Sequence, residues 1–338
     1  MNPPILSIVI PTYNRAPLLK LLLNSIVRDL PDWPEDVELV VSDNASTDGT
    51  RGVVAEVAAR GTPIRLVSNA ENVGMDRNLA ACFGLASGRY FWQIGDDDIL
   101  FEGALTRVLA ICRGPDFGIL HLASEGFHEG DQARIFAIRA PAAPTVLKLD
   151  RTSLFRSINV FLTFISANVV NRAAVLKRFP GFDHTADLNT YLPQLAWIYA
   201  AVEASDKHLH IPAPLFGALT GNTGGYRLVE VFGVNLARIT GRRLGAAIPR
   251  AESIMLNAAL TRVIGNEIGA LRKGGRQLNR FADEDTVAAM CRCFGKRFYF
   301  RALVGPMAFS SSRLGAAGLF LLLRFFNRVN RRLGYRLL

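Results

Sequence analysis

Short apolar runs alternate with amphipathic, helix-like stretches through the first part of the chain. Most runs are rich in β-branched or aromatic residues and end at a polar segment, which is typical of buried strands. Strands that alternate with helices indicate βαβ units, and such units place helices on both faces of a parallel sheet. We therefore predict an α/β fold with a mainly parallel sheet. The predicted strands are Leu6–Ile10, Val37–Ser42, Ile64–Ser68 and Tyr90–Ile94, and the predicted helices are Pro17–Arg28, Thr50–Arg60 and Met75–Ala86.

The pattern becomes mostly helical in the last third of the chain. A glycine-rich segment, Thr220–Tyr226, precedes this change and is expected to form a loop. We therefore predict an α/β domain over residues 1–225 and a helical C-terminal region over residues 226–338. Further strands are expected at Gly118–Ala123, Phe164–Asn171 and His208–Phe216, with helices at Phe101–Cys112, Ser153–Ile158 and Leu188–Ala204. Helices of the C-terminal region are expected at Val229–Arg238, Ala251–Arg272, Thr286–Phe294 and in the tail.

The composition indicates a folded protein with a basic tail. Of the 338 residues 50% are hydrophobic, which supports a sizeable core and excludes disorder. The four cysteines lack the spacing of a disulfide framework or a zinc site, so we interpret them as reduced thiols. The formal net charge is +10, and the segment from Thr286 to Leu338 carries ten Lys and Arg but no Asp or Glu. The whole excess of positive charge therefore lies in that segment.

The basic tail contains an apolar run, Leu314–Leu323, with an arginine on each side. This run is too short to span a bilayer, which takes about 20 predominantly apolar residues. A helical projection separates an apolar stripe from a basic one, and this favours a helix that lies on an anionic membrane surface through residues 313–338. The alternative is an ordinary helix that packs on the core. The apolar stripe is Leu319, Leu322, Phe326, Val329 and Leu333, and the basic stripe is Arg324, Arg328, Arg331 and Arg332.

The N-terminal residues show no targeting segment, since a buried strand is expected within the first few positions. We therefore expect a cytoplasmic protein that associates peripherally with the inner face of the cell membrane. Nucleic acid is not an expected partner, because the aromatic residues of the tail lie among leucines rather than between the arginines.

Polar segments follow three of the predicted strands, at Pro11–Arg15, Ser42–Gly49 and Gly95–Asp98. Ligands of open parallel sheets bind beyond the carboxyl ends of the strands, so we expect these segments to form one site. The chain lacks the GxxxxGK[ST] and GxGxxG patterns of common nucleotide-binding loops, and the GxSxG pattern of hydrolases. The segment Asp43–Asp48 lacks the ligand pattern of a calcium loop.

The third polar segment contains three successive aspartates, Asp96, Asp97 and Asp98. Adjacent carboxylates repel one another strongly where the dielectric constant is low. A divalent cation such as Mg²⁺ or Mn²⁺, held jointly with substrate phosphates, would offset this repulsion. The alternative is a solvated turn in which Asp98 caps the helix that begins near Phe101.

Four segments together resemble glycosyltransferase family 2 in their order and spacing: SIVIPTYNR (7–15), VVSDNASTDGT (40–50), NAENVGMDRN (69–78) and GDDD (95–98). The resemblance implies a GT-A fold and transfer of a sugar, with inversion, from a nucleotide diphosphate donor. The segments at 74–78 and 91–98 are closest to the abequosyl- and rhamnosyl-type transferases of bacterial surface polysaccharide synthesis. The QxxRW motif of processive synthases is missing, so the resemblance implies the addition of a single sugar.

The resemblance also implies roles for individual residues. Tyr13 would lie against the base, Arg15 near the diphosphate and Asp96 at the ribose, while Asp97 and Asp98 would hold Mn²⁺ or Mg²⁺. Many relatives read D-x-D-D here, and Gly95 replaces the first of these aspartates, so the choice of metal ligand among the three carboxylates stays open. The donor-binding residues implied in this way are Pro11, Thr12, Tyr13, Arg15, Asp43, Asn44, Arg77, Asn78 and Asp96.

Inversion requires a base that deprotonates the acceptor hydroxyl. Relatives supply it from an E-D-W-type segment, and Ala186-Asp187-Leu188 aligns with that segment. Asp187 is therefore the candidate base, with Asp183 and His184 as alternatives, although Asp187 also fits the N-cap of a helix. The acceptor is expected to be a saccharide, and relatives suggest one linked to a polyprenyl diphosphate.

Two other functions compete with a transferase. One is a membrane-associated protein that binds sugar nucleotides without catalysis. The other is a sugar nucleotidyltransferase, which would need a GGxGTRL-like loop where this chain has Pro11–Arg15.

Overall fold

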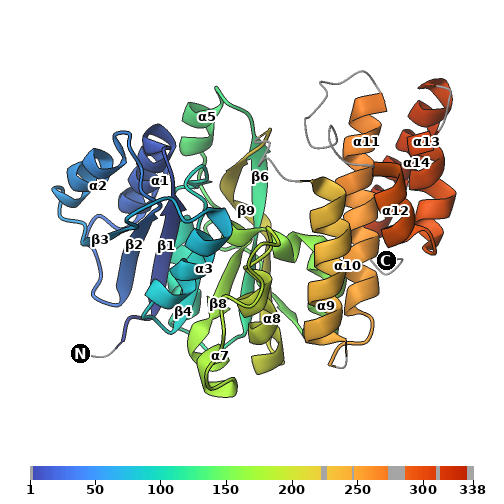
Figure 1. Ribbon diagram of the computed structural model, residues 1–338. Coiled ribbons are helices and arrows are strands. Elements are labelled where there is room, and N and C mark those ends of the chain that lie inside the picture. The colour runs from blue at the N-terminus through green and yellow to red at the C-terminus, as the bar shows by residue number, and fades with distance from the viewer. Residues whose placement is uncertain (1–2, 222–226, 246, 273–285, 310–312, 333–338) are drawn as a thin grey trace. The chain divides into compact units, whose positions relative to one another are not determined.

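The computed structural model describes residues 3–221, 227–245, 247–272, 286–309 and 313–332. The chain forms two compact units (Figure 1). The first unit comprises residues 1–151, 162–189 and 193–222, and the second comprises residues 152–161, 190–192 and 223–338. The loop predicted at Thr220–Tyr226 falls mostly on residues outside the described ranges.

The first unit is built on a nine-stranded sheet with the order β3-β2-β1-β4-β8-β6-β9-β5, and β7 pairs with β9. The first four strands are parallel, as the alternating pattern predicts. β1, β2 and β4 are almost fully buried, because helices cover both faces of the sheet. The four strands are β1 (Leu6–Thr12), β2 (Val37–Asp43), β3 (Ile64–Ser68) and β4 (Tyr90–Gln93).

The rest of the sheet includes antiparallel pairings, so the sheet as a whole is mixed rather than mainly parallel. β8 is antiparallel to β4 and β6, whereas β9 is parallel to β6 and antiparallel to β5 and β7. A short buried apolar run has the same pattern in either direction, so the sequence does not reveal these pairings. The strands are β5 (Ile99–Leu100), β6 (Ile119–Phe127), β7 (Leu147–Leu149), β8 (Asn168–Asn171) and β9 (His208–Leu219).

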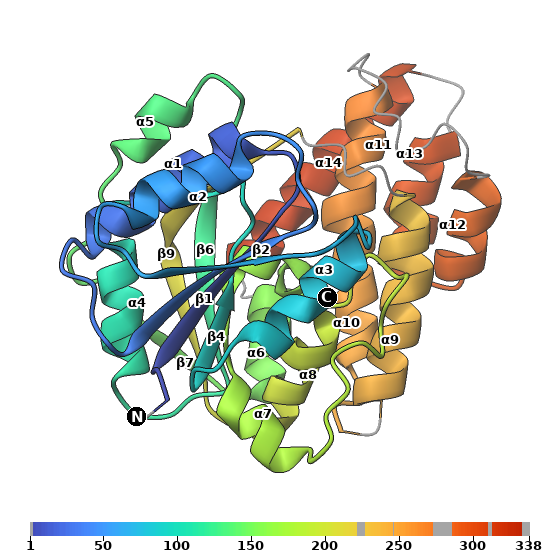
Figure 2. The same cartoon turned by 60° about the vertical axis from the view of Figure 1, so that its left-hand side comes forward.

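Helices α1 and α4 cover one face of the sheet, and α3 and α8 cover the other (Figures 1 and 2). On the α3 side, the ring of Phe83 lies 5.4 Å from that of Phe91 and 5.6 Å from that of Trp197, measured between centroids. Tyr90 and Trp92 are buried in the core on the opposite face. The helices of this unit are α1 (Ala16–Asp29), α2 (Thr50–Ala58), α3 (Met75–Leu85), α4 (Ala104–Cys112), α5 (Gln132–Phe136), α7 (Arg172–Arg178) and α8 (Leu195–Ala204).

Two predicted elements are shorter than expected by four residues or more. The helix predicted at Leu188–Ala204 begins only at Leu195, because Asn189 and Tyr191 have φ values of 60° and 59°. A right-handed helix of L-residues does not continue through this left-handed conformation. The strand predicted at Phe164–Asn171 is confined to β8, and the 3-10 turn η2 (Ile165–Ala167) precedes it.

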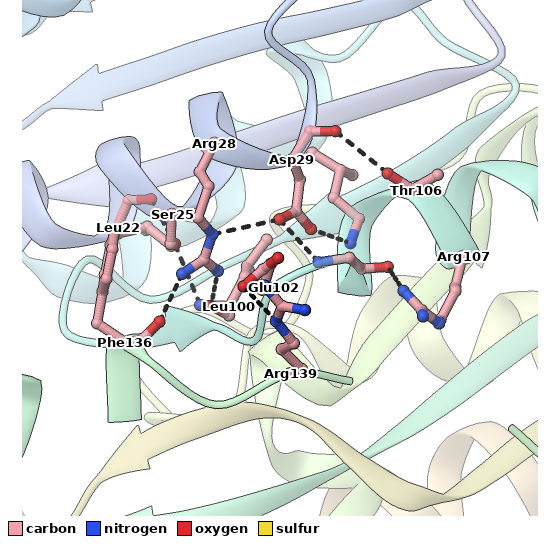
Figure 3. A network of polar contacts seen from close by, with 12 residues as sticks. Leu22, Ser25, Arg28, Asp29, Leu100, Glu102, Thr106, Arg107, Phe136 and Arg139 are labelled. Carbon is pink, nitrogen blue, oxygen red and sulfur yellow. Dashed lines mark hydrogen bonds and ion pairs between the residues drawn. The ribbon is translucent and has the colours of Figure 1, made fainter. Parts of the chain in front are cut away.

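The C-terminal end of α1 anchors the chain that follows the three aspartates (Figure 3). Arg28 Nη2 donates to the carbonyl of Leu100 at 2.8 Å. The Asp29 carboxylate accepts from the backbone amides of Gly103 and Leu105, each at 2.9 Å. Asp29 therefore caps the first turn of α4, which is the role that Asp98 has in the solvated-turn alternative. The helix begins at Ala104, and that alternative for Asp98 is wrong.

The second unit is helical in its described residues, and its main helices coincide closely with the predicted ones. α10, η4 and α11 together run from Ala251 to Arg272. Several turns in this unit are π-helical: η3, η4 and η6. The elements are α6 (Arg151–Ile158), η1 (Asn159–Thr163), η3 (Glu230–Asn235), α9 (Leu236–Leu244), α10 (Ala251–Ala258), η4 (Ala259–Ile264), α11 (Gly265–Arg272), α12 (Thr286–Phe294), η6 (Phe300–Val304), α13 (Gly305–Phe309) and α14 (Arg313–Arg332), of which α6 and η1 begin or end within the first unit.

Helix α14 buries a different stripe from the predicted apolar one. Ala316, Phe320, Leu323 and Asn330 are buried, whereas Leu322 of the predicted stripe is half exposed. The buried stripe is the one that neighbouring helices cover, and a helical projection of the sequence does not show which residues these are. Whether the predicted apolar stripe contacts a membrane stays a prediction. Leu333 lies outside the described residues. Among the helices that the structure describes, none has the length and hydrophobicity to cross a membrane.

Candidate active site

A cavity of about 420 Å³ lies at the carboxyl ends of β1, β2 and β4. The polar segments that follow these strands, at Pro11–Arg15, Ser42–Gly49 and Gly95–Asp98, each contribute to its wall. The cavity is thus at the edge of the sheet where the sequence predicts a site. Its lining residues are Pro11, Thr12, Tyr13, Arg15, Asn44, Asn72, Gly74, Met75, Asn78, Leu79, Gly95, Asp96, Asp97 and Ile165.

Asp96 accepts hydrogen bonds from two other residues that line this cavity. Its carboxylate accepts from Thr12 Oγ1 at 2.7 Å and from Arg15 Nη1 at 3.0 Å. The same Arg15 nitrogen lies 3.1 Å from Asp97 Oδ2. Burial raises the pKa of Asp96 to about 6, although the Arg15 charge partly counters the shift. The end of β1 therefore supplies both the hydroxyl and the cation that hold the aspartates after β4.

Asp98 lies behind the cavity wall and is 2% exposed. Its Oδ2 has no hydrogen-bond partner among the described residues. Burial, together with the neighbouring Asp97 charge, raises the pKa of this carboxyl well above its usual range. A buried carboxylate oxygen without a partner is costly unless a proton or a cation joins it.

The space beside Gly95 accommodates both of the predicted metal ligands. A Cβ atom at this position would lie 3.0 Å from Asp97 Oδ1 and 3.4 Å from Asp98 Oδ2. Both oxygens therefore face the same small space, which only a glycine leaves open. Two carboxylate oxygens beside one space fit a divalent cation whose other ligands are substrate oxygens. Among the described residues no group of three or more His, Cys, Asp and Glu has the geometry to hold a metal ion.

Asparagine side chains fix the loop between β3 and α3 on the other side of the cavity. Asn44 Nδ2 donates to Asn72 Oδ1 at 2.8 Å, and Asn44 Oδ1 accepts from the backbone amide of Val73 and from Asn69 Nδ2, each at 3.0 Å. Asn78 Oδ1 accepts from Ser42 Oγ at 2.8 Å. Asn69 and Asn72 are not among the residues predicted for the site. The asparagines within the segment 69–78 are the only sequence signal that indicates them.

Two predicted donor-binding residues do not line the cavity. Asp43 is fully buried, and its carboxylate accepts from the backbone amide of Ser46 at 2.9 Å and from Ser68 Oγ at 3.2 Å. It thereby shapes the loop after β2. Arg77 is exposed on α3, outside the cavity wall.

The three candidate bases also lie outside the cavity wall. Asp187 is 2% exposed, and because Gln194 is the N-cap of α8, the helix-capping alternative for Asp187 is wrong. Asp183 accepts from Thr185 Oγ1 at 2.6 Å and from its backbone amide at 2.8 Å. The His184 ring lies 5.8 Å from that of Phe83, and burial lowers the pKa of this imidazole.

Residues 7–162 match the family Glycosyl transferase family 2. The chain is 42% identical to abequosyltransferase RfbV of Salmonella typhimurium over 102 residues, which are 30% of each protein. It is 34% identical to the GalNAc(5)-diNAcBac-PP-undecaprenol beta-1,3-glucosyltransferase of Campylobacter jejuni over 107 residues, 31% of this chain and 34% of the relative. The chain thus spans about a third of the length of these curated relatives. The resemblance to the family and to its abequosyl-type members is confirmed.

The fold is similar to that of solved glycosyltransferase structures. Residues 1–349 of S. aureus TarS, in complex with UDP, superpose with a TM-score of 0.58 at 16% identity, covering 98% of this chain and 89% of that TarS chain. The mannosyltransferase PcManGT of Pyrobaculum calidifontis, in complex with GDP-Man and Mn²⁺, gives a TM-score of 0.50 at 18% identity and covers 98% of this chain and 87% of that one. At such identities the likeness shows the fold alone, and it confirms the predicted GT-A type.

Proposed function

Because residues 7–162 match glycosyltransferase family 2, we propose that the chain transfers a sugar, with inversion, from a nucleotide diphosphate donor to a hydroxyl of a saccharide. The product would be a bacterial surface polysaccharide, as the resemblance of residues 74–78 and 91–98 to abequosyl- and rhamnosyl-type transferases implies. The observation that carries this proposal is the contact of Arg15 with Asp96 and Asp97 in the cavity. This contact places the Arg15 cation, which could bind a diphosphate, beside two carboxylates. Asp96 could bind a ribose hydroxyl, and Asp97 could bind a metal ion.

The donor would occupy the cavity with its base near Tyr13, whose side chain is 42% exposed there. The Asp96 carboxylate would accept a ribose hydroxyl, and Thr12 and Arg15 would keep it oriented. Asn44 and Asn78 would support the wall from the side of α3. Asp43 and Arg77 lie outside the wall, and we assign Asp43 the indirect role of holding the loop after β2.

Asp97 and Asp98 would hold Mn²⁺ or Mg²⁺ beside Gly95. When bound, the cation neutralises the negative charge that develops on the departing diphosphate. The support for this site is the unpartnered Oδ2 of Asp98 together with the space that both carboxylates face.

We propose Asp187 as the base that takes the proton of the acceptor hydroxyl, with Asp183 and His184 as alternatives. A saccharide bound beside the donor would have to bring its hydroxyl within hydrogen-bond distance of this carboxylate. Since none of the three residues lines the cavity, a non-catalytic protein that binds sugar nucleotides is the second candidate function.

The acceptor is proposed to be linked to a polyprenyl diphosphate, as the name of the Campylobacter relative suggests for that enzyme. The described large hydrophobic side chains that are at least half exposed lie within the acid-free tail, residues 286–338: Phe298 (73%), Leu321 (59%), Leu322 (50%) and Phe325 (62%). Exposed apolar side chains among arginines are typical of segments that lie on anionic membranes. We therefore propose peripheral association with the inner face of the cell membrane.

Thermal unfolding with a panel of nucleotide diphosphate sugars, with and without Mn²⁺, tests the donor site. One donor should raise the melting temperature, and Mn²⁺ should increase that shift. A panel without any stabilising donor would contradict the proposal. An enzyme should release the sugar from the stabilising donor or transfer it to an acceptor. A protein that only binds sugar nucleotides should do neither.

A further inference from the structure

A basic hollow of about 430 Å³ lies in the second unit. One wall comes from Arg262 and Asn266, and the other comes from α14. Asn327 of α14 donates to the carbonyl of Thr261 at 2.9 Å, which fixes the two walls relative to each other. The residues of α14 that line the hollow are Leu321, Arg324, Phe325, Asn327 and Arg328.

Three arginines converge on this hollow. The guanidinium of Arg262 lies 4.3 Å from the ring centroid of Phe161, and its Nη1 lies 3.4 Å from Asn159 Oδ1, so its orientation is fixed. Arg324 and Arg328 are exposed and stand one helical turn apart on α14. In the described part of the chain neither of these two forms an ion pair, and the acid-free tail offers them no carboxylate.

Two of the most exposed apolar side chains, Leu321 and Phe325, lie at the same hollow. They alternate with the arginines along one face of α14, at positions 321, 324, 325 and 328. The hollow therefore offers guanidinium groups for an anion directly beside apolar surface. A free inorganic anion would gain nothing from that apolar surface, whereas a lipid uses both.

We propose that this hollow binds the phosphate group of an anionic phospholipid, with the lipid chains against Leu321 and Phe325. Guanidinium groups contact phosphate oxygens in pairs, and such charge-assisted hydrogen bonds are stronger than neutral ones. The inference deepens the proposed membrane association and rests on it. It adds that the tail selects a phosphate head group rather than responding to surface charge alone.

Flotation of the full chain tests this with phosphatidylcholine vesicles that contain either phosphatidic acid or phosphatidylglycerol at matched surface charge. The terminal phosphate of phosphatidic acid is open to paired arginine contacts, so the wild type should prefer these vesicles. Arg324→Gln and Arg328→Gln should each abolish the preference and weaken binding to phosphatidic acid about tenfold or more. Arg292→Gln, an exposed residue of the tail outside the hollow, is the matched control and should keep the preference with a loss of no more than about fivefold.

Different failures have different meanings. Equal binding to both kinds of vesicle, with equal losses in all three variants, would overturn the phosphate site and leave membrane association standing. A wild type that floats with neither kind would overturn both. Protection from thermal unfolding by inorganic phosphate, lost in Arg324→Gln and without any vesicle preference, would overturn the lipid in favour of a free phosphate ligand. None of these outcomes bears on the proposed transferase function, which sugar transfer to a soluble acceptor tests separately.

Discussion

The Arg15 guanidinium at the end of β1 lies 3.0 Å from the Asp96 carboxylate at the end of β4. The two strands are neighbours in the sheet, although the residues are 81 positions apart in sequence. Asp96 is nearly buried, and without this cation its charge would be stabilised mainly by Thr12. Arg15 therefore reduces the repulsion between the clustered carboxylates and also places a positive charge at the cavity.

Replacing Arg15 tests this relationship. Arg15→Gln should lower the affinity for the nucleotide diphosphate donor about tenfold to a hundredfold, because it removes charge-assisted contacts. Arg77→Gln removes the same charge from a neighbouring helix outside the cavity, so its affinity should fall much less. Calorimetric titration with the donor measures both constants. Equal losses in the two variants would show that the overall charge, and not the position of Arg15, governs binding.

The raised pKa of Asp96 predicts how stability depends on pH. The carboxyl titrates near 3.8 when unfolded and at about 6 in the folded protein. Between these values the folded state holds more protons, so the free energy of unfolding should decrease as pH rises from about 4 to about 6. This difference in pKa corresponds to a change of about 3 kcal/mol in the free energy of unfolding. Asp96→Asn should flatten this dependence.

Urea unfolding of the metal-free protein at several pH values measures the effect. A dependence as steep in Asp96→Asn as in the wild type would assign it to another group. The pKa of Asp98 is also raised, so this residue contributes with the same sign. The double variant Asp96→Asn, Asp98→Asn therefore shows whether the pH dependence that remains in Asp96→Asn belongs to Asp98.

The unpartnered Asp98 oxygen gives a prediction on metal binding. Asp98→Asn removes a buried carboxyl that is costly to ionise, so without metal it should raise the melting temperature, and it should abolish the stabilisation by Mn²⁺ and donor together. Asp97→Ala should likewise abolish transfer and metal-dependent donor binding without unfolding the protein. Asp32→Asn, on an exposed carboxylate, is the control and should change neither. An undiminished Mn²⁺ response in both site variants would place the cation elsewhere.

The sequence predicts those parts of the structure whose signals are local. β3 and α12 begin and end at their predicted residues, and the polar strand ends indicate the edge of the sheet that carries the cavity. The Asp29 cap of α4 joins residues 74 positions apart, and no local pattern reveals it. The same holds for the contact between Asn44 and Val73, and for the buried stripe of α14, which depends on which helices cover it.

Substitution of the proposed base tests the chemistry separately from binding. Asp187→Asn should lower the rate of sugar transfer by about two orders of magnitude or more and leave the donor affinity unchanged. Asp183→Asn is the matched control, since this carboxylate is occupied by Thr185 in an exposed loop. Transfer rates at saturating donor distinguish the variants. If Asp183→Asn or His184→Gln shows the larger loss instead, that residue is the base.

The exposed apolar side chains outside the hollow predict membrane association independently of the phosphate site. Phe298 and Leu322 are 73% and 50% exposed and do not line the hollow. Phe298→Ser combined with Leu322→Ser should weaken flotation with anionic vesicles about tenfold or more, because a buried Phe or Leu side chain contributes about 1.5–3 kcal/mol. Val234→Ser, at a 44% exposed position of η3, is the control and should float like the wild type. Since all three residues are exposed, the variants should unfold at the wild-type temperature. Unchanged flotation of the double variant would show that these side chains do not enter the membrane.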